Sequence, residues 1–168
     1  MTRWALVGIT ALGLSGLLAT VKLDPVETGA ATATDSIERG RYLVKIGGCN
    51  DCHTPNYLEK AGNVPKDRWL IGDSLGFNGP WGTTYPTNLR QLLRTMGEDD
   101  WVRSARTIET RAPMPWFNLR AMTEADLRAI HRYVLSLPAD DTPVPDYVPP
   151  DRPSKTPHIV FVPQAPKP

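Results

Sequence analysis

The chain has 168 residues, with 19 Lys and Arg against 18 Asp and Glu, and therefore a net charge of +1. This length accommodates one domain with flanking segments, and the balanced charge, without long runs of one sign, excludes a typical nucleic-acid-binding protein. We expect an N-terminal segment over residues 1–34, a folded domain over 35–138 and a proline-rich extended tail over 139–168.

The N-terminal segment has the features of an export signal. After Arg3, residues 4–21 are uncharged and rich in Ala, Leu, Val and Gly. A signal-peptide core spans about 7–15 residues and a membrane-spanning helix about 17–25, so this stretch is either cleaved, for example near Ala31-Thr32-Ala33, or kept as a membrane anchor. In both cases Arg3 stays inside and the domain lies outside the cytoplasmic membrane.

A first helix is predicted from Asp35, as N-cap with Glu38 three residues later, to the pair Gly47-Gly48. The small and polar residues 26–34 before it predict a linker. Gly40 inside this helix costs about 1 kcal/mol relative to alanine. Its presence favours a close contact with another helix at that position.

The stretch Cys49-Asn50-Asp51-Cys52-His53 follows this helix and contains both cysteines of the chain. It is the attachment pattern of a c-type haem. A helical turn across Cys49 and Cys52 presents both thiols to the two vinyl groups on one edge of a porphyrin. His53 then lies beneath the iron as its proximal ligand.

Three other interpretations of the two cysteines are weaker. A thioredoxin-like redox pair belongs in a βαβ context, and no buried β-rich run lies beside this one. A structural zinc site needs four ligands in closed spacing, whereas His131 and His158 are far apart in the sequence. A structural disulfide across two residues would remove little unfolded-state entropy.

Residues 55–88 lose periodicity and are rich in Gly, Pro and Asn, which predicts a long loop. A bound haem would supply the apolar surface on which such a loop folds. We expect aromatic and polar side chains of this loop to pack on the haem edge or to reach its propionates, with packing unrelated to the haem as the alternative. The candidates are Trp69, Trp81, Tyr85 and Asn88.

Three further helical segments are predicted. Asn88 caps a helix over residues 89–96, and a run of three acids opens another over 98–108. Thr123 caps the last helix, which ends at Pro138 and presents an apolar face. Beyond it, residues 138–168 contain ten prolines, which predicts an extended or disordered tail in which His158 has no special role.

The motif at 49–53, Met114 between two prolines and the helix over 123–137 together resemble class I cytochrome c domains, over residues 35–138. Within that class, the stretch Gly79 to Leu89, the run Pro113-Met114-Pro115 and the segment 122–127 resemble the haem modules in cytochrome subunits of periplasmic, membrane-bound dehydrogenases. Those subunits usually carry several modules, and this chain contains one motif.

The resemblance implies an all-α cytochrome c fold, with three to five helices around one covalently bound haem c and long loops. Its first and last helices cross near the haem, where Gly40 and Tyr133 are expected. It also implies a single-electron carrier and not an enzyme, located in the periplasm, soluble or anchored by residues 4–21. Redox partner proteins are expected, such as a membrane-bound dehydrogenase or a terminal oxidase.

Met114 is predicted to be the sixth iron ligand, beside His53. Proline residues on both sides hold it outside any helix, where a thioether can be directed at the iron. Met96 has the apolar spacing of a core residue, Met122 precedes an N-cap as half of a hydrophobic staple, and His131 lies within the last helix. Two other functions remain open: a haem enzyme or gas sensor with an open sixth position, and an anchored docking subunit.

Overall fold

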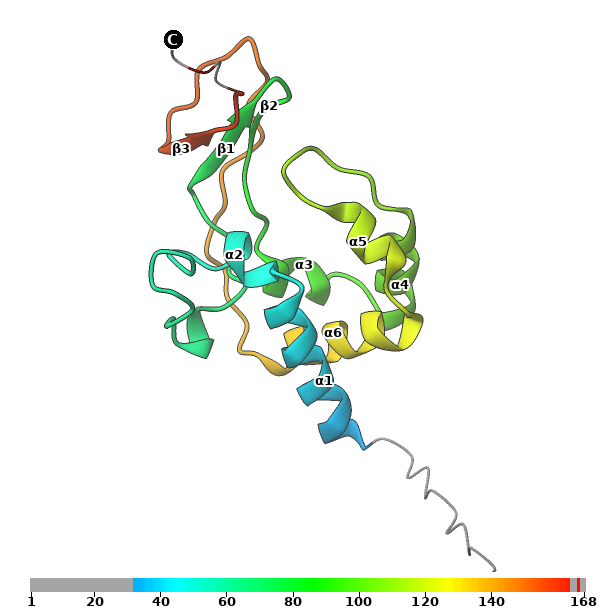
Figure 1. The fold of residues 1–168 in the computed structure, drawn as a ribbon. Coiled ribbons are helices and arrows are strands. Elements are labelled where there is room, and N and C mark those ends of the chain that lie inside the picture. Colours follow the sequence, from blue (N-terminus) through cyan, green and yellow to red (C-terminus); the bar gives the residue numbers. More distant parts are fainter. Residues whose placement is uncertain (1–31, 164–165, 167–168) are drawn as a thin grey trace, which may run out of the picture. The chain divides into compact units, whose positions relative to one another are not determined.

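The computed structural model describes residues 32–163 and 166, and the predicted export segment lies outside them. No helix within these described residues is both long and apolar enough to cross a membrane. The elements follow one another in the order shown in Figure 1: α1 (Ala33–Ile46), α2 (Cys49–His53), a short 3-10 helix (Lys66–Arg68), β1 (Gly76–Gly79), β2 (Gly82–Thr84), α3 (Leu89–Arg94), α4 (Glu98–Thr107), α5 (Trp116–Ala121), α6 (Glu124–Ser136) and β3 (His158–Val160).

α1 begins earlier than the sequence predicted. Thr32 is its N-cap: the Thr32 hydroxyl accepts from the Asp35 amide at 3.1 Å, and the Asp35 carboxylate accepts from the Thr32 amide at 2.9 Å. Two capping patterns overlap here, Thr32 with Asp35 and Asp35 with Glu38. In the structure the earlier pair forms the capping box, which satisfies two backbone amides at the start of the helix. The expected linker therefore contributes its last residues to α1.

α1 and α6 cross in close contact at Gly40 (Figure 1). A Cβ atom at Gly40 would lie 2.0 Å from the carbonyl oxygen of Ala129 and 2.7 Å from the Cβ atom of Tyr133. The two backbones therefore meet where no side chain fits. The predictions that Gly40 and Tyr133 lie at this crossing and that Thr123 caps the last helix are confirmed.

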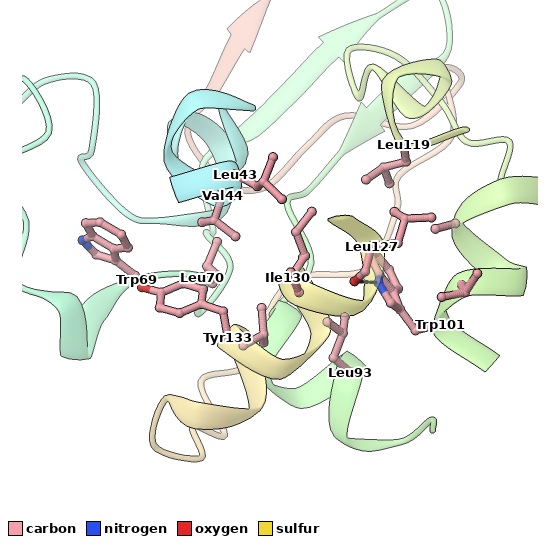
Figure 2. Close-up of a cluster of buried hydrophobic side chains, with 14 of the residues drawn as sticks. Leu43, Val44, Trp69, Leu70, Leu93, Trp101, Leu119, Leu127, Ile130 and Tyr133 are labelled. Atoms are coloured by element: carbon pink, nitrogen blue, oxygen red, sulfur yellow. Dashed lines mark hydrogen bonds between the residues drawn. The ribbon is translucent and has the colours of Figure 1, made fainter. Parts of the chain in front are cut away.

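Buried side chains from five helices form the core (Figure 2). The indole N–H of Trp101 donates to the carbonyl of Leu127 at 2.8 Å, which fixes α4 against α6. Each large apolar side chain contributes roughly 1.5–3 kcal/mol when fully buried. The core therefore holds the two crossing helices together and supports the shorter ones. Its members include Leu43, Val44, Leu93, Trp101, Leu119, Leu127, Ile130 and Tyr133.

Residues 55–88 are a loop in part, as predicted, but they also contain the 3-10 helix and a β-hairpin. β1 and β2 pair antiparallel, with Phe77 opposite Thr84. Three of the four residues of β1 are Gly or Asn, which are depleted in strands, and β2 has only three residues, so neither strand was predicted. The loop is fixed by buried Arg90 of α3, whose guanidinium donates to the carbonyls of Trp69, Lys66 and Pro138.

Residues 139–163 of the proline-rich tail contain no helix, and they add a strand to the hairpin. β3 pairs parallel with β1, so that the sheet order is β2-β1-β3, and Val148 forms an isolated bridge to Thr83. In Figure 1 the tail passes from the end of α6 to the far side of the hairpin. The expectation of an all-α fold with three to five helices is corrected: the described residues form six α-helices and a three-stranded sheet. α5 was not predicted.

Candidate haem site

The cysteine motif forms its own short helix. Gly48, with φ of +71°, lies in the left-handed region and turns the chain from α1 into α2, a conformation that glycine adopts without strain. α2 contains the whole motif from Cys49 to His53. The two thiols are thus about one helical turn apart, as thioether attachment to one porphyrin edge requires.

Both thiols and His53 line a cavity of about 220 Å³. A buried water occupies only about 10–15 Å³ on this measure, so the cavity is far larger than a packing defect. Its walls come from all six described α-helices and from the hairpin, and they are mainly apolar. They include Leu89, Leu93, Trp101, Leu119, Ile130 and Val134.

His53 is held in the orientation of a metal ligand. Its Nδ1 atom lies 2.7 Å from the carbonyl oxygen of Thr87, so Nδ1–H donates to that oxygen. Nε2 then carries the lone pair and is the nitrogen available to iron. Burial lowers the pKa of His53, which keeps the imidazole neutral. The sequence did not predict the contribution of Thr87, because a backbone carbonyl leaves no signal in residue type.

The thiols do not have the properties of a redox-active pair. Neither cysteine is in a disulfide. Burial raises the pKa of Cys49 to about 11 and also raises that of Cys52, whereas the reactive cysteine of a thioredoxin-like site has a lowered pKa. The described residues also contain no cluster of three metal-ligating His, Cys, Asp or Glu side chains.

Two methionines line the cavity. Met114 comes from the non-helical segment between α4 and α5, where the sequence placed it, and Met122 from the end of α5. The latter was expected to serve as part of a hydrophobic staple, and its role in the cavity wall was missed. Met96 packs on the core without lining the cavity. His131 is buried, with Nε2 3.2 Å from the carbonyl of Met96.

Of the other residues predicted to contact the haem, one lines the cavity and the rest do not. Tyr85 lines the cavity, and its hydroxyl lies 2.7 Å from that of Thr156 in the tail. Trp81 and Asn88 do not line it. The indole N–H of Trp81 donates to the Phe77 carbonyl. The Asn88 side chain is buried, where it caps α3 and donates to the Asp140 carbonyl at 3.1 Å.

Trp69 is also away from the cavity, since its indole N–H donates to the Val64 carbonyl in the core. Instead, polar groups that the sequence did not single out line the cavity: Thr84, Thr110, Arg111 and Asn118. Among the described residues, Arg111 is the only Lys, Arg, Asp or Glu in the wall. Its position three residues before Met114 was the one signal that could have indicated it.

Known proteins resemble this chain over the same region. The cytochrome c family model matches residues 37–138. The chain is 30% identical over 118 residues to the fructose dehydrogenase cytochrome subunit of Gluconobacter japonicus, covering 64% of this chain and 23% of that protein. It is 33% identical over 125 residues to the gluconate 2-dehydrogenase cytochrome c subunit of Pantoea cypripedii, covering 67% of this chain and 28% of that protein. No solved structure matches it.

The chain spans about a quarter of the length of these two relatives. Its cavity fits a haem: two thiols one turn apart, a neutral imidazole with Nε2 available, a nearby thioether and apolar walls. The chain therefore belongs to the cytochrome c family, and as such it binds haem c covalently and transfers electrons without itself converting a substrate.

Proposed function

We propose that the chain is a single-electron carrier whose haem iron is ligated by His53 and Met114. The observation that carries this proposal is the pairing of His53 Nδ1 with the Thr87 carbonyl, beside a cavity that Met114 also lines. When bound, the haem supplies the one-electron couple of its iron. The chain keeps both ligands in place, so that little reorganises between the two oxidation states, and His with Met favours the reduced iron.

Met114 is preferred to Met122 because of where each lies. A sixth ligand would have to come from a part of the cavity lining away from the motif that holds His53. The Cε atom of Met122 is 3.7 Å from the position that a Cβ atom would take on Gly47, beside Cys49 and so on the wall that carries the motif. Met114 comes instead from the non-helical segment between α4 and α5, and Pro113 and Pro115 stiffen its backbone. A substitution that removes the thioether of Met114 therefore does not disrupt a helix.

Substitution of Met114 tests the proposed ligation. Methionine ligation of oxidised iron gives a far-red charge-transfer band, and we expect Met114→Ala to remove this band and to lower the reduction potential. Met122→Leu and Met96→Leu are the matched controls and should keep both, because each replaces a thioether by an alkyl group of similar volume. Survival of the band in Met114→Ala would show that another residue is the ligand.

The proposed setting is the periplasm. Residues 1–34 direct export and are cleaved or retained as an anchor, residues 35–138 carry the haem, and residues 139–168 form a proline-rich extended tail. We propose a membrane-bound dehydrogenase as electron donor, since both relatives are cytochrome subunits of dehydrogenases, and a terminal oxidase or another redox protein as acceptor. N-terminal sequencing of the haem protein checks export: intact Met1 in soluble cytoplasmic protein would contradict it.

A further inference from the structure

Arg111 lies at the cavity without a carboxylate partner among residues 32–163. It belongs to the segment between α4 and α5, three residues before Met114, and it is exposed. The structure shows no hydrogen bond or ion pair of its guanidinium with any residue in 32–163. The nearby carboxylate of Glu109 lies 3.9 Å from Arg120 instead. Arg111 is thus a cation with free N–H donors beside a cavity that takes an anionic cofactor.

The tail holds this guanidinium in place. Its central carbon lies 3.8 Å from the ring centroid of Tyr147, so the cation rests on the aromatic face. The Tyr147 hydroxyl donates to the Trp81 carbonyl at 2.8 Å, and the next residue, Val148, exchanges two backbone hydrogen bonds with Thr83. Tyr147 is therefore fixed to the hairpin and offers Arg111 a rigid platform.

The segment that carries Arg111 is tied to the same hairpin. The hydroxyl of Thr84 in β2 donates to the carbonyl of Ala112 at 3.0 Å. A Cβ atom at Gly82 would lie 2.3 Å from the Val148 carbonyl oxygen, so hairpin and tail are in direct backbone contact as well. Hairpin, tail and the Arg111 segment thus form one assembly at the cavity wall.

We propose that Arg111 pairs with a propionate carboxylate of the haem, and that Tyr147 is its positioning residue. When a guanidinium stacks on an aromatic ring, the ring covers its face but leaves the N–H groups along its edge free. These N–H groups can donate two parallel hydrogen bonds to one carboxylate. Among the described residues, the rest of the cavity wall contains no Lys, Arg, Asp or Glu. The inference rests on the haem that the family binds, and it does not depend on which residue is the sixth ligand.

The reduction potential tests the pairing, because a cation near the haem favours the reduced iron. We expect Arg111→Gln to lower the midpoint potential by more than Arg106→Gln does. Arg106 is the matched control: it is an exposed arginine on α4 that does not line the cavity. Arg111→Lys keeps the charge and should lower the potential less. Haem content and the far-red band are measured alongside, so that a lost haem or a changed ligand is recognised.

Two substitutions of Tyr147 test its positioning role. Tyr147→Phe keeps the ring under the guanidinium and should leave the potential close to that of the unchanged protein. Tyr147→Leu removes the ring and should shift the potential in the same direction as Arg111→Gln, by less. In the redox-difference infrared spectrum of protein with ¹³C-labelled propionates, the carboxylate bands should move in Arg111→Gln and in Tyr147→Leu.

Equal shifts of potential in Arg111→Gln and Arg106→Gln, with unmoved propionate bands, would overturn the pairing. An unchanged potential combined with weaker binding of a redox partner would assign Arg111 to an acidic partner surface and would overturn it as well. If Arg111→Gln does not accumulate as holoprotein, Arg111→Lys tests the pairing instead. Lysine cannot form the two parallel hydrogen bonds of a guanidinium, so unmoved propionate bands in Arg111→Lys would contradict the pairing.

Discussion

Cys52→Ser is expected to lose most of the holoprotein. The thiols of Cys49 and Cys52 lie one turn apart at the cavity, and serine cannot form the thioether bond to a vinyl group. Without the haem, the apolar walls of the cavity lose the group that covers them, and exposing apolar surface to water destabilises the fold.

Acid–acetone extraction measures the covalent bond directly. In the unchanged protein the colour should remain with the polypeptide, and the little haem that Cys49→Ser/Cys52→Ser retains should pass into the organic phase. Thr54→Ser is a suitable control near the motif, because it keeps the hydroxyl that bonds to Asn50. Extraction of the colour from the unchanged protein would contradict covalent attachment.

Gly40→Ala is expected to destabilise the fold by about 2 kcal/mol or more, although alanine is the better helix former. Helix propensity alone would stabilise the variant by about 1 kcal/mol. The added Cβ atom, however, would lie 2.0 Å from the Ala129 carbonyl oxygen, and overpacking of this kind typically costs 1–3 kcal/mol or more. Because the obstacle is backbone, α1 must move away from α6, and packing outweighs propensity.

Urea unfolding of the holoprotein, followed by far-UV circular dichroism, measures this change. Gly97→Ala is the matched control: a Cβ atom there would have its nearest neighbour, the Asp100 carboxylate, at 3.6 Å, and its φ of −74° suits any residue. The control should change the free energy of unfolding by less than 1 kcal/mol. A Gly40→Ala protein as stable as the unchanged one would show that the crossing is looser than the structure indicates.

The parts of the site that depend on neighbouring residues, such as motif spacing, prolines and helix caps, were predicted from the sequence. Haem attachment requires the spacing of Cys49, Cys52 and His53, so the spacing alone predicted their role. α2 holds all three residues on one short helix. The flanking prolines kept Met114 out of a helix and at the cavity. The cap at Thr123 and the periodicity after it located α6.

The remaining parts depend on contacts between distant segments. The partner of His53 is the backbone carbonyl of Thr87, which any residue type supplies. The strands form because the tail returns to the hairpin at Ile159, opposite Phe77. Ile159 and Val160 are strand formers, but their run is short and lies in the proline-rich tail, so its pairing with a distant segment could not be predicted locally. Trp81 was expected at the haem edge because it is aromatic, but its indole N–H bonds within the hairpin.

Spectroelectrochemistry of the full chain tests the central claim most directly. An electron carrier with two protein ligands should show one reversible transition of a single electron, with six-coordinate low-spin spectra in both oxidation states, and its reduced form should not bind carbon monoxide at once. A haem enzyme or gas sensor leaves its sixth position open. A five-coordinate high-spin spectrum with rapid carbon monoxide binding in the reduced protein would contradict the account.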